Sequence, residues 1–205
     1  MISLAILAGG KSGRMGQDKA LKLFLGRPLI FHTIEQLKFL SEDIFVVVNC
    51  PANYSFLGLQ LYQDIKPGLG PLGGIYTTLS VAKNSLVAVV GCDMPFSSLP
   101  LFEYERNLII KLGVDVVIPS TPHGLEPLHA VYRPETCLPF IKSAIEAGER
   151  KITCWFHKIK VHVLSLDETE KYTPLYQAFI NLNTPEEFQQ AEQSLLAQGQ
   201  PKTIS

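Results

Sequence analysis

The sequence predicts an α/β fold of three layers, in which helices cover both faces of a Rossmann-like, mostly parallel sheet. Short apolar runs at residues 2–7, 44–48 and 86–90 show no regular polar alternation, which is typical of strands covered on both faces. Segments with helical spacing separate these runs, and this alternation favours parallel strands joined by crossover helices. No break in composition and no internal repeat is present, so we expect one domain over residues 1–198 and a polar tail at 199–205.

The overall composition excludes several classes of protein. With 205 residues, of which 46% are hydrophobic and 18% charged, and a formal net charge of −1, the chain resembles neither a disordered nor a polyanion-binding protein. No long basic run is present, so we expect no nucleic-acid partner. The N-terminal apolar segment lacks preceding basic residues and is only as long as a strand, so we expect no membrane association. Four widely spaced cysteines without a Cys-x-x-Cys pair indicate reduced thiols in the cytoplasm.

The first strand leads into a segment rich in glycine and basic residues. Its glycines and cations are Gly9, Gly10, Gly13, Gly16, Lys11, Arg14 and Lys19. Glycines let main-chain N–H groups approach an anion without a Cβ clash, and the basic side chains add full positive charge. The spacing matches neither a P-loop, which would require glycine where Ala5 stands, nor the G-x-G-x-x-G dinucleotide fingerprint. The segment therefore predicts a phosphate-bearing ligand.

Two further strands and two helices are expected in the first half of the chain. Apolar residues at helical spacing predict a helix from Pro28 to about residue 40. The β-branched run at 44–48 is a strand, and a short strand is expected at 59–62. A second glycine-rich segment covers residues 66–75, and a helix follows it to residue 82.

The second half of the chain continues the alternation. The expected elements are a strand at 86–90, a helix at 99–112, strands at 115–119 and 128–133, a helix at 136–147, a strand at 161–164 and a helix from about 185 to 197. Thr184 and Glu187 have the spacing of a capping box, and Pro185 suits the first position of the last helix.

Polar residues follow several of these elements at one expected edge of the sheet. In open α/β sheets, ligands bind outside the carboxyl ends of the strands. We therefore expect the loops after Leu7, Val48, Val90 and Ile180 to form the functional edge. The residues in those loops that can contact a ligand are Gly9, Gly10, Asn49, Asp93, Asn181 and Asn183.

Five short segments resemble the molybdenum cofactor guanylyltransferases, a family of nucleotidyltransferases. They are LAGGKSGRMGQDK at 7–19, GPLGG at 70–74, CDMPF at 92–96, EPLHAVYR at 126–133 and NLNTPEE at 181–187. The resemblance implies the fold of the nucleotide-diphospho-sugar transferases. It also implies an enzyme that transfers GMP from GTP to the phosphate of molybdopterin, forms molybdopterin guanine dinucleotide and releases pyrophosphate.

The resemblance also implies the nucleotide-binding residues. They are Leu7, Ala8, Gly9, Gly10, Gly13, Lys19, Asn49, Asp64, Gly70, Pro71, Leu72 and Gly73. A carboxylate can accept hydrogen bonds from the ring N–H and the exocyclic amine of guanine, whereas cytosine lacks that pair of donors. Gly73 departs from the guanylyl pattern, in which alanine is frequent. The implied partners are GTP, molybdopterin, other molybdenum-cofactor biosynthesis proteins and apo-molybdoenzymes.

The chemistry of nucleotidyl transfer indicates which residues are catalytic. The acceptor phosphate is already ionised, so the reaction needs alignment and charge neutralisation of two anions rather than a general base. Arg14 and Lys19 are the predicted cations. Asp93 follows the strand at 86–90, with Pro95 setting the chain direction, and we predict that Asp93 holds Mg²⁺. A strand-end Asp is also a frequent turn former, but the basic glycine loop favours the metal role.

Several alternatives stay open from the sequence. Asn181 and Asn183 are candidates for a second metal contact or an acceptor contact, or they only shape the turn before the capping box. His129 is expected to be structural or peripheral rather than catalytic. The substrate alternatives are CTP or another phosphorylated acceptor, and a noncatalytic GTP-binding regulator is the alternative outside enzymes.

Overall fold

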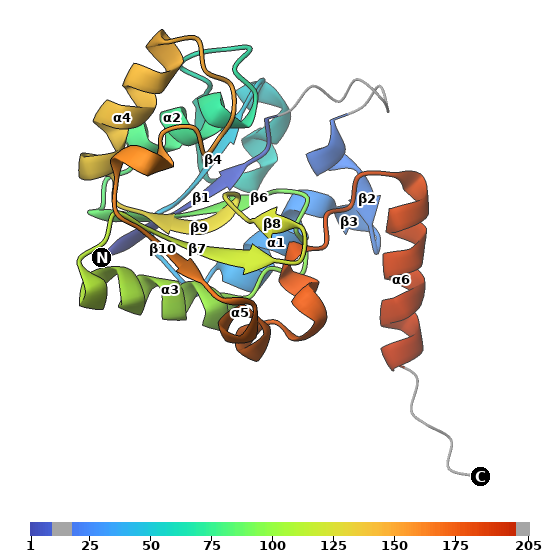
Figure 1. The fold of residues 1–205 in the computed structure, drawn as a ribbon. Coiled ribbons are helices and arrows are strands. Elements are labelled where there is room, and N and C mark those ends of the chain that lie inside the picture. Colours follow the sequence, from blue (N-terminus) through green and yellow to red (C-terminus); the bar gives the residue numbers. More distant parts are fainter. Residues whose placement is uncertain (10–17, 200–205) are drawn as a thin grey trace.

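The computed structural model describes residues 1–9 and 18–199, in which a central sheet lies between two layers of helices (Figure 1). The strands of this sheet are β1 (Ile2–Leu7), β4 (Ile44–Val48), β5 (Gln60–Gln63), β6 (Leu86–Gly91), β7 (Val116–Thr121), β8 (Gly124–Leu125), β9 (His129–Tyr132) and β10 (Val161–Leu164). Their order is β10-β7-β9-β6-β1-β4-β5, and β8 pairs with β7. Neighbouring strands are parallel except where β9 meets β6 and β7 and where β8 meets β7. The predicted α/β architecture with a mostly parallel sheet is confirmed.

Different helices cover the two faces of the sheet. On one face lie α2 (Pro71–Val81) and α4 (Pro134–Glu146), which contribute to one buried cluster. On the other face lie α1 (Leu29–Leu37), α3 (Leu99–Leu112) and α5 (Leu166–Tyr172). The strands between them therefore bury side chains in both directions.

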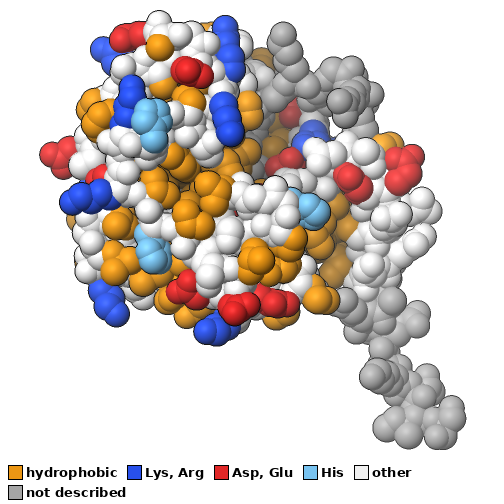
Figure 2. Space-filling model, in the orientation of Figure 1, with side chains coloured by type: hydrophobic (Ala, Val, Ile, Leu, Met, Phe, Trp, Pro, Cys, Tyr) orange, Lys and Arg blue, Asp and Glu red, His pale blue; other side chains and the backbone are white. Residues whose placement is uncertain are grey.

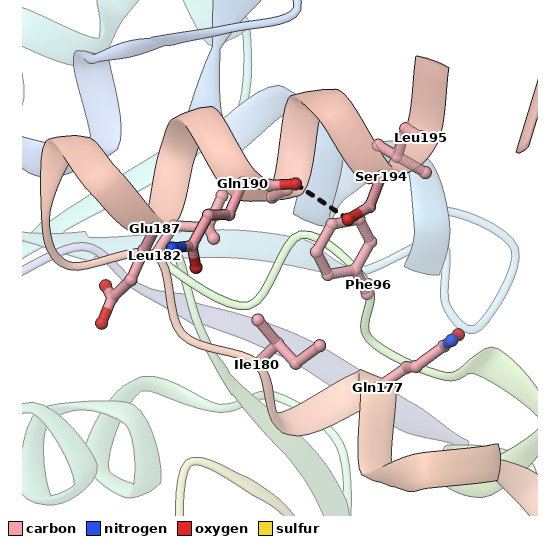
Figure 3. A pocket seen from close by; sticks show the side chains of 9 residues that line it. Phe96, Gln177, Ile180, Leu182, Glu187, Gln190, Ser194 and Leu195 are labelled. Atoms are coloured by element: carbon pink, nitrogen blue, oxygen red, sulfur yellow. Dashed lines mark hydrogen bonds between the residues drawn. The ribbon is translucent and has the colours of Figure 1, made fainter. Parts of the chain in front are cut away.

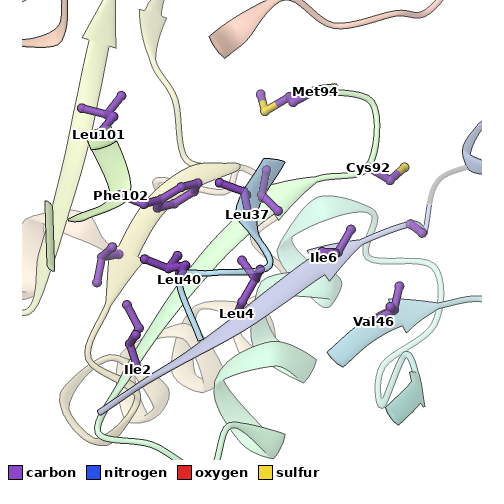
Figure 4. Close-up of a cluster of buried hydrophobic side chains, with 14 of the residues drawn as sticks. Ile2, Leu4, Ile6, Leu37, Leu40, Val46, Cys92, Met94, Leu101 and Phe102 are labelled. Atoms are coloured by element: carbon purple, nitrogen blue, oxygen red, sulfur yellow. The ribbon is translucent and has the colours of Figure 1, made fainter. Parts of the chain in front are cut away.

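The central strand β1 shows how this burial follows from the sequence. Leu4 and Ile6 join the cluster on the α1 and α3 side, which Figure 4 shows around Leu37 and Phe102. Ala5 and Leu7 join the cluster on the α2 and α4 side. Because alternate residues point to opposite faces and both faces are covered, the strand is a continuous apolar run rather than an alternating one.

The last helix, α6 (Pro185–Gly199), lies apart from the two helix layers, next to a small hairpin (Figure 1). The hairpin consists of β2 (Leu23–Phe24) and β3 (Arg27–Pro28). Phe188 of α6 packs with Phe24, Leu29 and Leu182 in a third buried cluster. None of the described helices combines the length and the apolar character needed to cross a membrane.

The capping box at the start of α6 is confirmed. The Thr184 hydroxyl accepts a hydrogen bond from the Glu187 amide at 3.2 Å, and the Glu187 carboxylate accepts one from the Thr184 amide at 2.9 Å. These bonds satisfy two amide groups that the first turn of a helix would otherwise leave unpaired.

Some elements differ from the prediction. The strand expected at 59–62 lies one residue later, at Gln60–Gln63. The β2–β3 hairpin was not predicted, because its turn residues Leu25 and Gly26, with φ of 48° and 77°, lack the Asn-Gly pattern that marks such turns. Helix α5 was also not predicted, although Ser165 and Glu168 form its capping box, because it has only seven residues.

Candidate functional site

Three side chains from distant parts of the chain meet beyond the carboxyl ends of the central strands. The Nζ atom of Lys19 lies 2.6 Å from Asp93 Oδ2 and 2.6 Å from Asn183 Oδ1. The side chains of Lys19 and Asp93 are 25% and 19% exposed, so this ion pair is partly buried but still accessible to solvent. The structure thus brings together two predicted catalytic residues and one of the two predicted asparagines.

The pairing of β1 with β6 places Asp93 at this position. Leu7 at the end of β1 is in register with Gly91 at the end of β6, so the two following loops leave the sheet side by side. The Cys92 amide donates to the Leu7 carbonyl at 3.0 Å, which extends the parallel ladder by one more bond. The chain leaves β1 toward β4 on one side while β6 lies on the other, and ligands bind at such switch points of open sheets.

Gly91 provides the space that the Asp93 carboxylate occupies. A Cβ atom placed on Gly91 would lie only 2.6 Å from Asp93 Oδ1. Real Cβ atoms do not approach other heavy atoms so closely, so any side chain at position 91 would displace the carboxylate. Sequence reasoning did not identify Gly91 as a functional residue.

A single turn of 3₁₀-helix, η1 (Lys19–Leu21), holds Lys19. The Asp18 carboxylate accepts from the Ala20 amide at 3.3 Å, and the Asp18 carbonyl accepts from the Leu21 amide at 3.1 Å. Ala20 is only 1% exposed and belongs to the core. The turn is therefore anchored by burial while Lys19 at its start extends toward Asp93.

The two candidate asparagines have different positions. The Asn183 side chain reaches Lys19, and the main-chain N–H of Asn183 donates to the Glu187 carboxylate. The Asn181 side chain instead donates to the Phe179 carbonyl at 3.1 Å, within its own turn. The Leu182 amide between them donates to the Asp93 carbonyl at 3.0 Å and so fastens this segment to the loop after β6.

The other side of the β1 terminus carries the residues predicted to surround the base. The Ala8 amide donates to the Val47 carbonyl at 2.9 Å, so Ala8 continues β1 alongside β4. A Cβ atom on Gly9 would lie 3.4 Å from Asn49 Oδ1, which places the Asn49 side chain directly beside Gly9. The end of β1 therefore has Asp93 on one side and Asn49 on the other.

The second glycine segment forms the start of α2. Gly70 precedes the helix with φ 59° and ψ −143°, a conformation that favours glycine, and Pro71 occupies the first turn. Leu72 is fully buried in the core, so only its main chain remains available to a nucleotide. A Cβ atom on Gly73 would lie 3.1 Å from both the Lys66 carbonyl oxygen and Leu69 Cβ. Glycine at position 73 therefore lets the preceding loop pack closely against the helix.

Asp64 lies beside this helix and is held by it. Its Oδ1 atom accepts from the Thr77 hydroxyl at 3.3 Å, and the same hydroxyl oxygen accepts from the Ile65 amide at 3.0 Å. Burial raises the pKa of Asp64 above its ordinary value, and the bond from Thr77 opposes that shift. Hydrogen-bond donors from a bound base would stabilise the charged form further.

Three predicted residues, Gly10, Gly13 and Arg14, lie outside the described residues. Of the first motif, the structure describes Leu7 to Gly9 and residues 18 and 19. The contacts predicted for Gly10, Gly13 and Arg14 therefore stay predictions.

The described residues contain no group of three or more His, Cys, Asp or Glu side chains suited to a metal ion. The oxygens of Asp93 and Asn183 nevertheless converge on one cation, the Lys19 ammonium group. Mg²⁺ is commonly bound by one or two protein oxygens together with substrate phosphates, rather than by a complete protein cage. The donor set at Asp93 fits that mode.

His129 lies at the start of β9, and neither ring nitrogen hydrogen-bonds to a described residue of the site. Its side chain is fully buried, its ring stacks on Phe102 with centroids 3.9 Å apart, and its Nδ1 atom lies 3.5 Å from Glu105 Oε1. Burial lowers the pKa of His129 to about 3 and raises that of Glu105 well above its usual value. Burial therefore favours the uncharged form of both groups, which agrees with the structural role predicted for His129.

Sequence reasoning missed three supporting residues besides the predicted ones. They are Gly91, Thr77 and Glu187, of which Glu187 was identified only as a helix cap. The Gly-x-Asp spacing after a buried strand was a visible signal for Gly91. Nothing local in the sequence indicated that Thr77 would reach Asp64, because a helical turn and a loop bring them together.

Comparisons with known proteins agree with this geometry. The model of a family described as the MobA-like NTP transferase domain matches residues 4–162. A probable molybdenum cofactor guanylyltransferase from Carboxydothermus hydrogenoformans is 32% identical over 190 residues, covering 92% of this chain and 93% of the relative. Another probable molybdenum cofactor guanylyltransferase, from Clostridium perfringens, is 35% identical over 191 residues, covering 91% and 94%.

The fold is also similar to that of a solved structure. The crystal structure of molybdopterin-guanine dinucleotide biosynthesis protein A from Archaeoglobus fulgidus superposes with a TM-score of 0.82 at 25% identity. The match covers 96% of this chain and 100% of that one. It therefore extends beyond residue 162, where the match to the family model ends.

Proposed function

The chain belongs to the MobA-like NTP transferase family, and from this premise we propose that it transfers GMP from GTP to the phosphate of molybdopterin. The products are molybdopterin guanine dinucleotide and pyrophosphate. The observation that carries this proposal is the meeting of Lys19, Asp93 and Asn183 at the carboxyl edge of the sheet. The names of the relatives and of the structural neighbour support the same reaction.

The protein residues act by neutralising charge and by alignment. A phosphate oxygen of the acceptor attacks the α-phosphorus of GTP, and the bond to the leaving pyrophosphate breaks. Lys19 supplies a cation beside this position. Before GTP and the metal bind, Asp93 and Asn183 hold Lys19 in place, and the hydrogen bonds from Cys92 and Leu182 hold the main chain around Asp93. Because the acceptor phosphate is ionised, no residue has to remove a proton from it.

We assign the divalent metal to Asp93, with Asn183 as the second protein oxygen. Mg²⁺ bound there would neutralise phosphate charge during transfer. Lys19 already occupies a cation position between the two oxygens, which supports a site that attracts positive charge. When GTP enters, Lys19 can turn to a phosphate. The Asp93 carboxylate can stay where it is, because Gly91 has no side chain to displace it.

Recognition of guanine is assigned to the other side of β1. Gly9, Asn49 and the start of α2 form one wall, and Asp64 presents a carboxylate there. A carboxylate matches the ring N–H and exocyclic amine of guanine, whereas cytosine offers no such pair of donors. We expect preference for GTP over CTP for this reason.

We assign this activity to one nucleotidyltransferase domain spanning residues 1–198. The described cysteines Cys50, Cys92, Cys137 and Cys154 are free thiols, which supports the expectation of a reducing, cytoplasmic environment. Other molybdenum-cofactor biosynthesis proteins and apo-molybdoenzymes are the proposed macromolecular partners.

The direct test measures pyrophosphate release from the protein with molybdopterin, Mg²⁺ and each of GTP and CTP. We expect release with GTP and formation of the dinucleotide product. Release with CTP alone would overturn the assignment of the base. Binding of GTP without turnover, in the presence of intact acceptor and metal, would indicate a regulator instead of an enzyme.

A further inference from the structure

A cavity lies beside the catalytic centre, between α6 and the segment that leads to Asn183 (Figure 3). Its volume is about 280 Å³, and its lining residues are Phe96, Gln177, Ile180, Leu182, Glu187, Gln190, Ala191, Ser194 and Leu195. None of these residues belongs to the nucleotide-binding set. The cavity therefore offers space for a second molecule next to the proposed GTP site.

We propose that this cavity binds the pterin ring of the acceptor, with the ring lying between Phe96 and Ile180. This inference rests on the proposed function, because it assigns the binding site of the acceptor in that reaction. A pterin is a flat bicyclic ring with an apolar face and an edge of alternating hydrogen-bond donors and acceptors. Sites for such ligands combine apolar walls with a few polar groups, in cavities of roughly 300 Å³ and larger.

The apolar walls of the cavity come from three parts of the chain. Phe96 lies in the loop between β6 and α3, Ile180 and Leu182 precede Asn183, and Leu195 lies on α6. The Phe96 ring is held edge-on against Phe24, with centroids 6.1 Å apart and an interplanar angle of 84°. A flat heteroaromatic ring can gain both area burial and aromatic contact from such a wall.

Polar groups at the rim match the edge of a pterin. Figure 3 shows Gln190 and Ser194 on α6 across the opening from Ile180. The Ser194 hydroxyl donates to the main-chain carbonyl of Gln190 at 2.9 Å, so the Gln190 side-chain amide is not used in this bond. The side-chain amides of Gln190 and Gln177 each carry both a donor and an acceptor, which suits a ligand edge that presents both.

A strained turn brings Gln177 and Ile180 to the cavity. Leu175 and Tyr176 adopt left-handed conformations with φ of 53° and 54°, which are unfavourable for residues other than glycine. Thr173 holds this turn, because its hydroxyl accepts from the Ala178 amide at 2.8 Å and its carbonyl accepts from the Tyr176 amide at 3.0 Å. Such strain persists where the surrounding structure imposes it, often beside a ligand.

The cavity is connected to the catalytic centre by hydrogen bonds. Leu182, which lines it, donates through its amide to the Asp93 carbonyl at 3.0 Å. Glu187, which also lines it, accepts from the amide of Asn183, and Asn183 contacts Lys19. We expect a ring held in the cavity to extend its phosphate-bearing substituent toward Asp93 and Lys19, where the proposed transfer takes place.

The first test fills the cavity with a larger side chain. Ile180→Trp should raise the KM for molybdopterin by about tenfold or more, which corresponds to about 1.4 kcal/mol, and leave the KM for GTP unchanged. The matched control is Ile110→Trp, since Ile110 is also an exposed isoleucine, 62% accessible, but lies on α3 and does not line the cavity. An unchanged acceptor KM in Ile180→Trp, with GMP transfer intact, would overturn the pterin site and leave the proposed function standing.

The second test measures binding without turnover, with free pterin (2-amino-4-oxopteridine) as the probe. Quenching of pterin fluorescence by the wild-type protein and by Ile110→Trp, but not by Ile180→Trp, is the expected result. Gln190→Leu keeps the size of the side chain but removes its amide, and it should weaken pterin binding by about three- to tenfold. Pterin binding that is sensitive to Ile180→Trp in a protein without GMP transfer would support the site and refute the function. Equal binding by all the variants would refute the site.

Discussion

Gly91→Ala should move the Asp93 carboxylate without removing it, and so test whether its position matters for catalysis. The added Cβ would lie 2.6 Å from Asp93 Oδ1, whereas an ordinary contact begins near 3.4 Å, so the oxygen must move by about 0.8 Å. A displacement near 1 Å in a catalytic constellation can reduce the rate about 10²-fold. We therefore expect kcat to fall by about that factor while Asp93 itself remains.

The fold should tolerate this substitution. Gly91 lies in β6, and its φ is outside the left-handed range, so alanine can adopt the same backbone. The atom that has to move is the end of a side chain, and the other neighbour, Met94 Sδ, is at an ordinary 3.7 Å. The assay is steady-state GMP transfer together with thermal unfolding of the same sample. A wild-type kcat for Gly91→Ala would refute the reasoning.

A double-mutant cycle provides the control for Gly91→Ala. In an Asp93→Ala background the clashing oxygen is absent, so the same glycine substitution should stabilise the protein by about 0.4–1 kcal/mol through the unfolded chain. In the wild-type background the clash should remove that gain. Equal changes in unfolding free energy in both backgrounds would show that the contact with Asp93 has no influence.

The remaining predictions concern the ion pair and the buried pair beneath it. Asp93→Ala should lower kcat by at least about 10²-fold with the fold retained, as measured by turnover and circular dichroism. Lys19→Ala should lower kcat/KM for GTP about 10²-fold, because the cation acts in both the ground state and the transition state, and unchanged kinetics would exclude it. Glu105 binds its proton more tightly when folded, and His129 has a lowered folded pKa. Above about pH 6.5 His129 is neutral in both states, whereas Glu105 keeps its proton to a higher pH in the folded state than in the unfolded chain. Stability should therefore fall as pH rises from about 6.5 toward the folded pKa of Glu105, by up to about 1.4 kcal/mol per pH unit. Glu105→Gln should abolish that fall in urea unfolding measured upward from about pH 6.5, and an unchanged slope would assign it to other groups.

Most elements of the fold could be predicted because their signals are local. The apolar runs at β1, β4 and β6 and the helical spacing of α3 depend on neighbouring residues alone. The direction of β9 could not be predicted, since a four-residue run has the same pattern in a parallel and an antiparallel strand.

The sequence by itself predicted that the loops after β1 and β6 and the segment at 181–183 belong to a single edge, with Lys19, Asp93, Asn181 and Asn183 as candidates. Only the tertiary structure decided between those asparagines, because Asn183 reaches Lys19 while Asn181 bonds to its own turn. The space beside Gly91 and the cavity next to α6 are also visible only in the tertiary structure. Residue type and spacing carry chemical identity and the succession of elements along the chain, whereas contacts over 74 or 164 positions arise only when distant segments pack together.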